Sequence, residues 1–167
     1  GEINVDKEGN CYVATCTVSS DFPVTNGAAQ PTYGGGDEDA VCFKLDADLN
    51  NLLWSTYIGG SKADAAYALA LDDSNNVFIT GGTRSDTDFP VTSNALNISY
   101  KGGVSDGFIS HIKNDGSVLV SSTYVGTTGY DQSFFIQLDT KQNVYIYGQT
   151  DGAYPVSSSV YTNVNSG

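Results

Sequence analysis

The chain repeats one sequence pattern at a fixed distance. Residues 55–83 read STYIGGSKADAAYALALDDSNNVFITGGT, and residues 122–150 read STYVGTTGYDQSFFIQLDTKQNVYIYGQT. Tyr57 and Tyr124 in these segments are 67 positions apart. The same spacing separates further pairs, which are Phe22 and Phe89, Asp39 and Asp106, Asp64 and Asp131, and Val77 and Val144. Self-similarity at a fixed period indicates a fold that is assembled from repeated structural units.

Each unit contains four segments with the composition of β-strands. They are rich in Val, Ile, Tyr, Phe and Thr, and clusters of Gly, Ser, Asn and Asp separate them. In the most complete unit these segments are residues 65–71, 76–83, 107–112 and 117–125. Asp115 and Gly116 give a hairpin signal between the last two segments. We therefore expect an all-β chain of four-stranded antiparallel sheets.

Several predicted strands are apolar on both faces. Residues 41–43 read VCF and residues 134–136 read FFI, without the alternation that is typical of a half-exposed strand. A sheet that is covered on both faces has such strands. Four-stranded sheets stacked around a central axis, as in a β-propeller, are covered in this way. The sequence therefore predicts propeller blades.

The repeat divides this single propeller segment into three units. Residues 1–63 form a partial unit, residues 64–130 a complete unit and residues 131–167 a second partial unit. The chain thus holds two and a half blades, whereas a closed propeller typically has about 4–8. We expect a larger ring, or a ring completed by other copies, because open sheet edges promote pairing. The absence of Met and of a signal peptide also indicates a piece of a longer protein.

The first unit carries a recognisable family pattern. Residues 9–61 read GNCYVATCTVSSDFPVTNGAAQPTYGGGDEDAVCFKLDADLNNLLWSTYIGGS, which resembles the bacterial β-propeller repeat called the SBBP repeat. The chain departs from that pattern at Cys16, where small residues are usual, and at residues 153–155, which replace the DFP segment. The resemblance implies a module of a large secreted or cell-surface bacterial protein, in some cases an adhesive one. Most proteins with this repeat have no assigned activity.

The charge of the chain restricts its partners. Nineteen Asp and Glu residues face seven Lys and Arg residues, so the net charge is −12. Such a surface repels nucleic acid and anionic membranes, and no apolar run approaches the length of about 18 residues that a membrane helix needs. We expect partners to be the remaining blades of the same protein or another copy of the chain, together with a protein or a carbohydrate. We expect neither nucleic-acid binding nor membrane insertion.

The long connections between predicted strands indicate where a ligand would bind. Residues 18–38, 84–105, 58–63 and 126–130 are expected to emerge on one face of the blades. Long loops on a rigid scaffold commonly carry binding sites. Tyr33 and Tyr100 occupy equivalent loop positions and are candidates for stacking on carbohydrate. Arg84 is a candidate ligand-binding residue on the same face.

Aspartates recur at the start of predicted strands and allow two interpretations. Asp39, Asp64, Asp106 and Asp131 have the spacing of the repeat, which favours carboxylates that cap turns by accepting backbone N–H groups. The alternative is a calcium site that is formed by Asp37, Glu38 and Asp39, because carboxylates are hard oxygen ligands. The sequence leaves both interpretations open.

No pattern in the sequence indicates a catalytic site, and we expect no enzyme. His111 is the only histidine, and no Gly-x-Ser-x-Gly elbow is present. The three cysteines do not form a disulfide framework, although Cys16 and Cys42 allow one cross-strand bond. We expect a non-enzymatic scaffold or recognition module that binds protein or glycan through the long-loop face. The alternatives are a non-catalytic part of a propeller-type hydrolase or lyase, and a purely structural spacer in a surface assembly.

Overall fold

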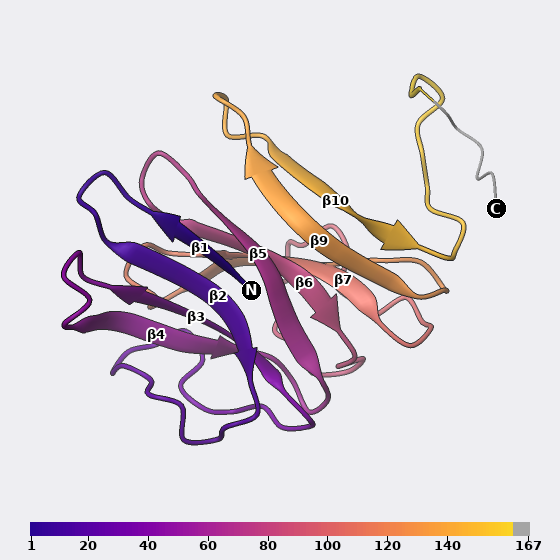
Figure 1. The fold of residues 1–167 in the computed structure, drawn as a ribbon. Coiled ribbons are helices and arrows are strands. Elements are labelled where there is room, and N and C mark those ends of the chain that lie inside the picture. Colours follow the sequence, from indigo (N-terminus) through magenta and orange to yellow (C-terminus); the bar gives the residue numbers. More distant parts are fainter. Residues whose placement is uncertain (162–167) are drawn as a thin grey trace.

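The computed structural model describes residues 1–161, which form three antiparallel sheets (Figure 1). The first sheet contains β1 (Glu2–Val5), β2 (Cys11–Thr17), β3 (Asp39–Leu45) and β4 (Leu52–Ile58) in that order. The second contains β5 (Asp64–Leu71), β6 (Val77–Thr83), β7 (Asp106–Ile112) and β8 (Leu119–Val125). The third pairs β9 (Asp131–Leu138) with β10 (Val144–Thr150). The predicted all-β, four-stranded unit is therefore confirmed.

The observed strand ends differ from the expected ones mainly at β8. That strand begins at Leu119, two residues later than predicted. Gly116 has a φ of 71°, which belongs to a turn. The main-chain N–H and the hydroxyl of Ser117 both donate to Oδ1 of Asp115, so this residue also stays in the turn. Local side-chain bonds thus delay the start of the strand.

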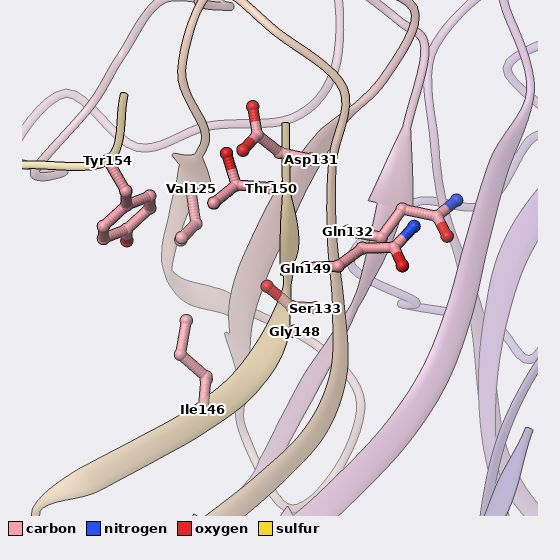
Figure 2. A pocket seen from close by; sticks show the side chains of 9 residues that line it. All are labelled: Val125, Asp131, Gln132, Ser133, Ile146, Gly148, Gln149, Thr150 and Tyr154. Carbon is pink, nitrogen blue, oxygen red and sulfur yellow. The ribbon is translucent and has the colours of Figure 1, made fainter. Parts of the chain in front are cut away.

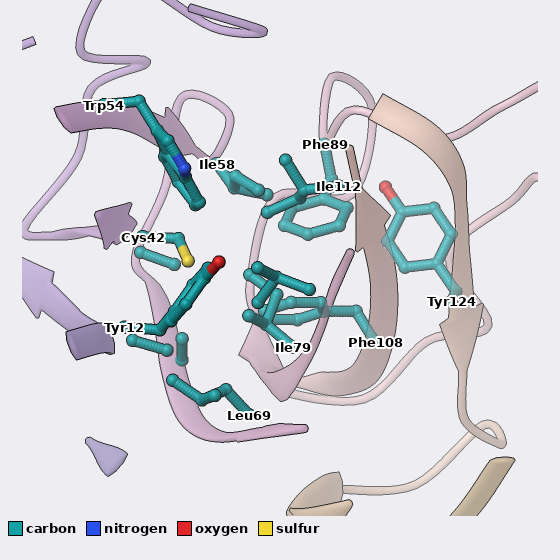
Figure 3. Close-up of a cluster of buried hydrophobic side chains, with 14 residues drawn as sticks. Tyr12, Cys42, Trp54, Ile58, Leu69, Ile79, Phe89, Phe108, Ile112 and Tyr124 are labelled. Atoms are coloured by element: carbon teal, nitrogen blue, oxygen red, sulfur yellow. The ribbon is translucent and has the colours of Figure 1, made fainter. Parts of the chain in front are cut away.

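The three sheets are stacked, with the second between the other two (Figure 1). The larger buried cluster joins the first sheet to the second (Figure 3). It includes Tyr12 and Trp54 on one side and Ile79 and Phe108 on the other. A smaller cluster joins Ala68 and Ala70 of the second sheet to Ile136 of the third. Apolar residues on both faces of the middle sheet are therefore buried, as the sequence predicted.

The turn between the first and second strand of every unit is held by one aspartate. In the first unit Oδ1 of Asp6 accepts a bond of 2.8 Å from the main-chain N–H of Asn10. Oδ1 of Asp72 accepts an equivalent bond of 2.8 Å from Asn76. In the third unit Asp139 and Asn143 form the same pair. The asparagine amide also donates to the second carboxylate oxygen in each case, so both residues contribute to the turn.

The three cysteines lie in the first sheet and are free thiols. Cys16 pairs with Ala40, and Cys42 pairs with Ala14, across β2 and β3. The bond between Cys16 and Cys42 that the sequence allowed is therefore not formed. Within residues 1–161, no helix has the length and apolar character needed to cross a membrane.

Candidate functional site on the long-loop face

The two long loops of residues 18–38 and 84–105 are fixed by equivalent bonds. The main-chain N–H of Gln30 donates to the hydroxyl of Thr56 over 2.9 Å. In the next unit, the N–H of Asn97 donates to the hydroxyl of Thr123 over the same distance. Both threonines belong to the fourth strand of their sheet. Each loop is therefore tied to the outer strand of its own blade.

Buried tyrosines hold the start of each loop. The hydroxyl of Tyr57 donates to the carbonyl oxygen of Ser19 over 2.9 Å. The hydroxyl of Tyr124 donates to the carbonyl oxygen of Ser85 over 2.7 Å. Burial raises the pKa of both phenols, so they remain protonated donors at neutral pH. The repeated STY segment thus has a structural role in shaping the loop face.

The predicted ligand-binding tyrosines occupy matching positions. Each ring is half-buried, and its centroid lies 5.8 Å from that of the buried tyrosine of its unit, Tyr57 for Tyr33 and Tyr124 for Tyr100. The hydroxyl of Tyr33 donates to Gly36 over 3.1 Å, and that of Tyr100 donates to Gly103 over 3.3 Å. The rings are therefore fixed in orientation, with part of each surface open to solvent. Their predicted ligand-binding role stays a prediction.

Acidic groups surround both tyrosines. The pKa of Tyr100 is raised to about 12, chiefly by burial and then by the charge of Asp106, while the positive charge of Arg84 acts in the opposite direction. Arg84 is exposed directly after β6, in the loop that carries Tyr100. Burial and the charge of Asp39 raise the pKa of Tyr33. Both rings therefore have acidic groups nearby, and Tyr100 has a cation in addition.

The predicted calcium ligands do not converge. Asp37 is exposed, Glu38 is half-buried, and Asp39 is fully buried. No group of three or more His, Cys, Asp or Glu side chains among residues 1–161 is arranged to hold a metal ion. Oδ2 of Asp39 instead accepts a bond of 2.5 Å from the main-chain N–H of Gly34.

The capping interpretation of the four recurring aspartates is confirmed. Each carboxylate accepts a bond from a main-chain N–H four or five residues earlier in the chain. The donors for the other three are Gly60 to Asp64 at 2.7 Å, Lys101 to Asp106 at 2.6 Å and Thr127 to Asp131 at 2.6 Å. All four side chains are buried. They fix the short turns and loop ends that border the long-loop face.

These aspartates also meet in pairs across the sheet junctions, which the sequence analysis missed. A Cβ on Gly59 would lie 2.5 Å from Oδ1 of Asp39 and 3.0 Å from Oδ2 of Asp64, so the two carboxyl groups face one glycine. Burial, together with the charges of Asp64 and Asp88, raises the pKa of Asp39 to about 7. Burial also raises the pKa of Asp64. The sequence contained a signal for these contacts. Asp39 in a third strand and Asp64 in the next first strand are 25 residues apart, and so are Asp106 and Asp131.

At the second junction, Asp106 likewise faces a glycine. A Cβ on Gly126 would lie 2.5 Å from Oδ1 of Asp106. Burial raises the pKa of Asp106 to about 6, and the charge of Asp131 contributes in the same direction. Each junction between neighbouring sheets therefore contains a carboxyl group whose pKa is raised above that of an ordinary aspartate.

A pocket of about 300 Å³ lies where β8, β9 and β10 meet (Figure 2). Its lining includes Val125, Ser133, Ile146, Gly148 and Tyr154. Figure 2 shows the side chains of Val125, Ile146 and Tyr154 bordering one space beside β10. The sequence analysis did not identify this pocket, although the incomplete third unit was a signal for it.

One segment of the chain, which joins the first two sheets, matches a known family model. The family model of the SBBP β-propeller repeat matches residues 53–90. This part of the chain is similar to the SBBP repeat. It runs from β4 through β5 and β6 to the DFP segment, so it contains Gly59 and Asp64 of the first junction but not Asp39. The match confirms the resemblance for this segment and, with the stacked antiparallel sheets, the propeller-blade fold. A search of the curated proteins found no match to the chain.

Proposed function

We propose that this SBBP-repeat segment is a non-enzymatic recognition module of a secreted or cell-surface bacterial protein, and that it binds glycan or protein through the long-loop face. The observation that carries this proposal is the fixed, half-exposed tyrosine that recurs in two consecutive loops, at Tyr33 and Tyr100. Aromatic rings held in one orientation lose little entropy on stacking against a ligand. A ring on each of two neighbouring blades suits a ligand that itself repeats, which favours a polysaccharide.

The loop geometry supports recognition over chemistry. Both loops are tied to the outer strands by equivalent bonds, so their surface is formed before a ligand arrives. Arg84, exposed in the same loop as Tyr100, supplies a cation for an acidic sugar or a carboxylate on the same surface. Because the chain as a whole carries a net charge of −12, an acidic ligand is repelled by most of the surface. A local cation therefore selects the place where such a ligand binds.

A titration with a panel of neutral and acidic oligosaccharides tests the proposal. We expect saturable binding to one class of oligosaccharide, measured by calorimetry, and a fall of about tenfold or more when both Tyr33→Ala and Tyr100→Ala are introduced. Phe at the same two positions retains the rings and should retain most of the affinity. Arg84→Ala should weaken only the binding of acidic oligosaccharides.

Substitutions at the opposite ends of the strands provide the matched control. Asp48→Ala and Glu8→Ala lie in exposed hairpin turns away from the long loops and should leave binding unchanged. Equal losses from both sets of variants would contradict a site on the long-loop face. The absence of binding to every oligosaccharide would contradict glycan recognition.

A further inference from the structure

The turn of residues 25–28 in the first long loop contains the only Asn-Gly pair of the sequence. The main-chain N–H of Ala28 donates to the carbonyl oxygen of Thr25 over 3.3 Å and closes the turn. Gly27 has a φ of 81°, and apart from its chain neighbours no atom lies within 4 Å of the position that a Cβ would occupy. Asn26 and Gly27 are both exposed. The pair therefore lies in solvent, on a turn whose third position favours glycine.

The exposure of this turn does not depend on a missing neighbour. In the second unit, which has a sheet on either side, the N–H of Ala95 donates to the carbonyl oxygen of Thr92 over 3.1 Å and closes the equivalent turn. Its middle residues, Ser93 and Asn94, are exposed as well. Here, however, the asparagine is followed by alanine. The chain thus contains a matched comparison for the reactivity of Asn26.

Asn26 also differs from other asparagines in the freedom of its side chain. Many of the others donate their side-chain amide to a carboxylate or a carbonyl oxygen, namely Asn10, Asn51, Asn76, Asn97, Asn114 and Asn143. Within residues 1–161, no hydrogen bond holds the side chain of Asn26 or the main-chain N–H of Gly27. These two groups are therefore free to rotate toward one another.

A free asparagine side chain beside a glycine is suited to one spontaneous reaction. The main-chain nitrogen of the following residue attacks Cγ of the asparagine, and the new N–Cγ bond closes a succinimide ring. The Cγ–Nδ2 bond breaks, and Nδ2 leaves as ammonia with the proton that the main-chain nitrogen loses. A Cβ on the following residue hinders the attack, and glycine has none.

Water then opens the ring at one of its two carbonyl carbons. Attack at Cγ gives an aspartyl residue. Attack at the main-chain carbon gives an isoaspartyl residue, in which the chain runs through the side-chain carbons. In sum, water is consumed and ammonia is released, so the conversion needs neither an enzyme nor an oxidant.

We propose that Asn26 is a site of spontaneous modification, at which this exposed turn changes from a neutral asparagine to an aspartyl or isoaspartyl residue. Residues 18–38 include Asp21, Asp37 and Glu38 but no Lys or Arg. The product therefore adds a negative charge to a loop that is already acidic, on the face that carries Tyr33.

The isoaspartyl product also lengthens the main chain between two anchors of the loop. On one side, the hydroxyl of Thr25 accepts a bond of 3.0 Å from the N–H of Ser55 on β4. On the other side, the N–H of Ala29 donates to the carbonyl oxygen of Gly116 over 2.8 Å, which joins the loop to a hairpin of the second unit. An added methylene group between positions 26 and 27 has to be accommodated between these bonds. It therefore loosens the contact of Ala29 with the second unit.

The test incubates the full chain at neutral and at mildly alkaline pH, and follows each asparagine by peptide mapping with mass spectrometry. We expect Asn26 to lose its amide first, at a rate that rises with pH because the deprotonated main-chain nitrogen is the nucleophile. Asn94, in the equivalent turn, should stay intact over the same period. An Asn26 that remains intact would overturn the proposal, as would loss of the amide of Asn94 at the same rate.

Two substitutions test the reaction itself. Gly27→Ala should slow the loss of the amide severalfold, because its Cβ hinders the attack. Alanine is strained at a φ of 81°, so Asn26→Gln provides a second variant that leaves the glycine in place. Its amide would have to close a larger ring and should remain intact. Equal rates in the wild-type chain and in either variant would overturn attack by the main-chain nitrogen of Gly27.

The structural consequence is tested on the modified chain, which anion exchange separates by its added charge. Hydrogen exchange at the amide of Ala29 should be faster in the isoaspartyl form than in the unmodified chain. Asn26→Asp adds the charge without the extra methylene group and should leave this exchange rate nearly unchanged. Equal exchange rates in the isoaspartyl form and in Asn26→Asp would overturn the loosening of the contact.

Discussion

Oδ1 of Asp39 occupies the space next to Gly59 in which any other residue would carry its Cβ. A Cβ on Gly59 would lie 2.5 Å from that oxygen, and Gly126 has the same relationship to Asp106 at the next junction. The residue that follows the fourth strand must therefore be glycine. The carboxyl group of the third-strand aspartate fills the space in which a larger side chain would lie.

Gly59→Ala should destabilise the chain by about 1–3 kcal/mol, because a methyl group is forced against the carboxyl group of Asp39. Chemical unfolding measures the change. Gly126→Ala should have a similar effect, since its Cβ would meet Asp106 at the same distance. In a double-mutant cycle, Asp39→Ala should remove part of the Gly59→Ala penalty. If the two changes in unfolding free energy were fully additive, the contact between the new methyl group and Asp39 would not be the cause of the destabilisation.

Folding stability should decrease as the pH rises from about 4 to about 7. Burial and the charges of Asp64 and Asp88 raise the pKa of Asp39 to about 7 in the folded chain, whereas an aspartate in an unfolded chain ionises near pH 4. Between these values the folded state binds more protons, so deprotonation favours unfolding. Unfolding free energies measured across this range test the sign.

Asp39→Asn should reduce this pH dependence, because the amide cannot ionise, and should leave the contribution of Asp106 in place. Asp37→Asn is the matched control: it removes the same charge from an exposed neighbour and should leave the slope almost unchanged. A wild-type slope in Asp39→Asn would contradict the assignment of the effect to the junction.

Much of the fold was predictable, because Tyr57 and Tyr124 reveal the period and the strand composition follows from it. The capping role of Asp39 was predictable from its recurrence with Asp106. Its approach to Asp64 was not, because the period describes one unit, while this contact depends on how two sheets stack. The calcium interpretation failed to find support for the same physical reason: Asp39 turns inward to the junction, and Asp37 stays in solvent.

Part of the division into units remains a prediction. The third unit was expected to span residues 131–167, of which residues 162–167 lie outside the described residues. The tyrosines of the candidate site were located by the repeat alone, since Tyr33 and Tyr100 recur at the same loop position. Their packing against Tyr57 and Tyr124 depends on loop closure over the sheet, which the sequence pattern does not describe.

Tyr124→Phe should loosen the loop of residues 84–105. The buried hydroxyl donates to Ser85 over 2.7 Å, and its removal leaves that carbonyl without this bond, at a cost of about 1–2 kcal/mol. Hydrogen exchange should become faster for amides of that loop. Tyr147→Phe removes a hydroxyl from an exposed tyrosine on β10 in the third sheet and should leave the loop amides unaffected. Equal effects of the two changes would argue against a specific anchor.

Phe89→Ala should destabilise the chain by about 3–5 kcal/mol, since the ring is 3% exposed and packs on Phe108 and Tyr124. Its equivalent Phe22 is only half-buried, although it contacts Phe43 and Tyr57. Phe22→Ala should therefore cost clearly less. Thermal or chemical unfolding compares the two variants, and the reverse order would contradict the observed packing of the DFP segments.

Residues 1–161 form stacked propeller blades, and within these residues β10 is paired on one side only. Native-state hydrogen exchange tests this arrangement most directly, by comparing the amides of β6 with those of β10. We predict strong protection throughout β6, which lies between β5 and β7, and fast exchange for the outward-pointing amides of β10. Equal protection of the two strands would contradict the account.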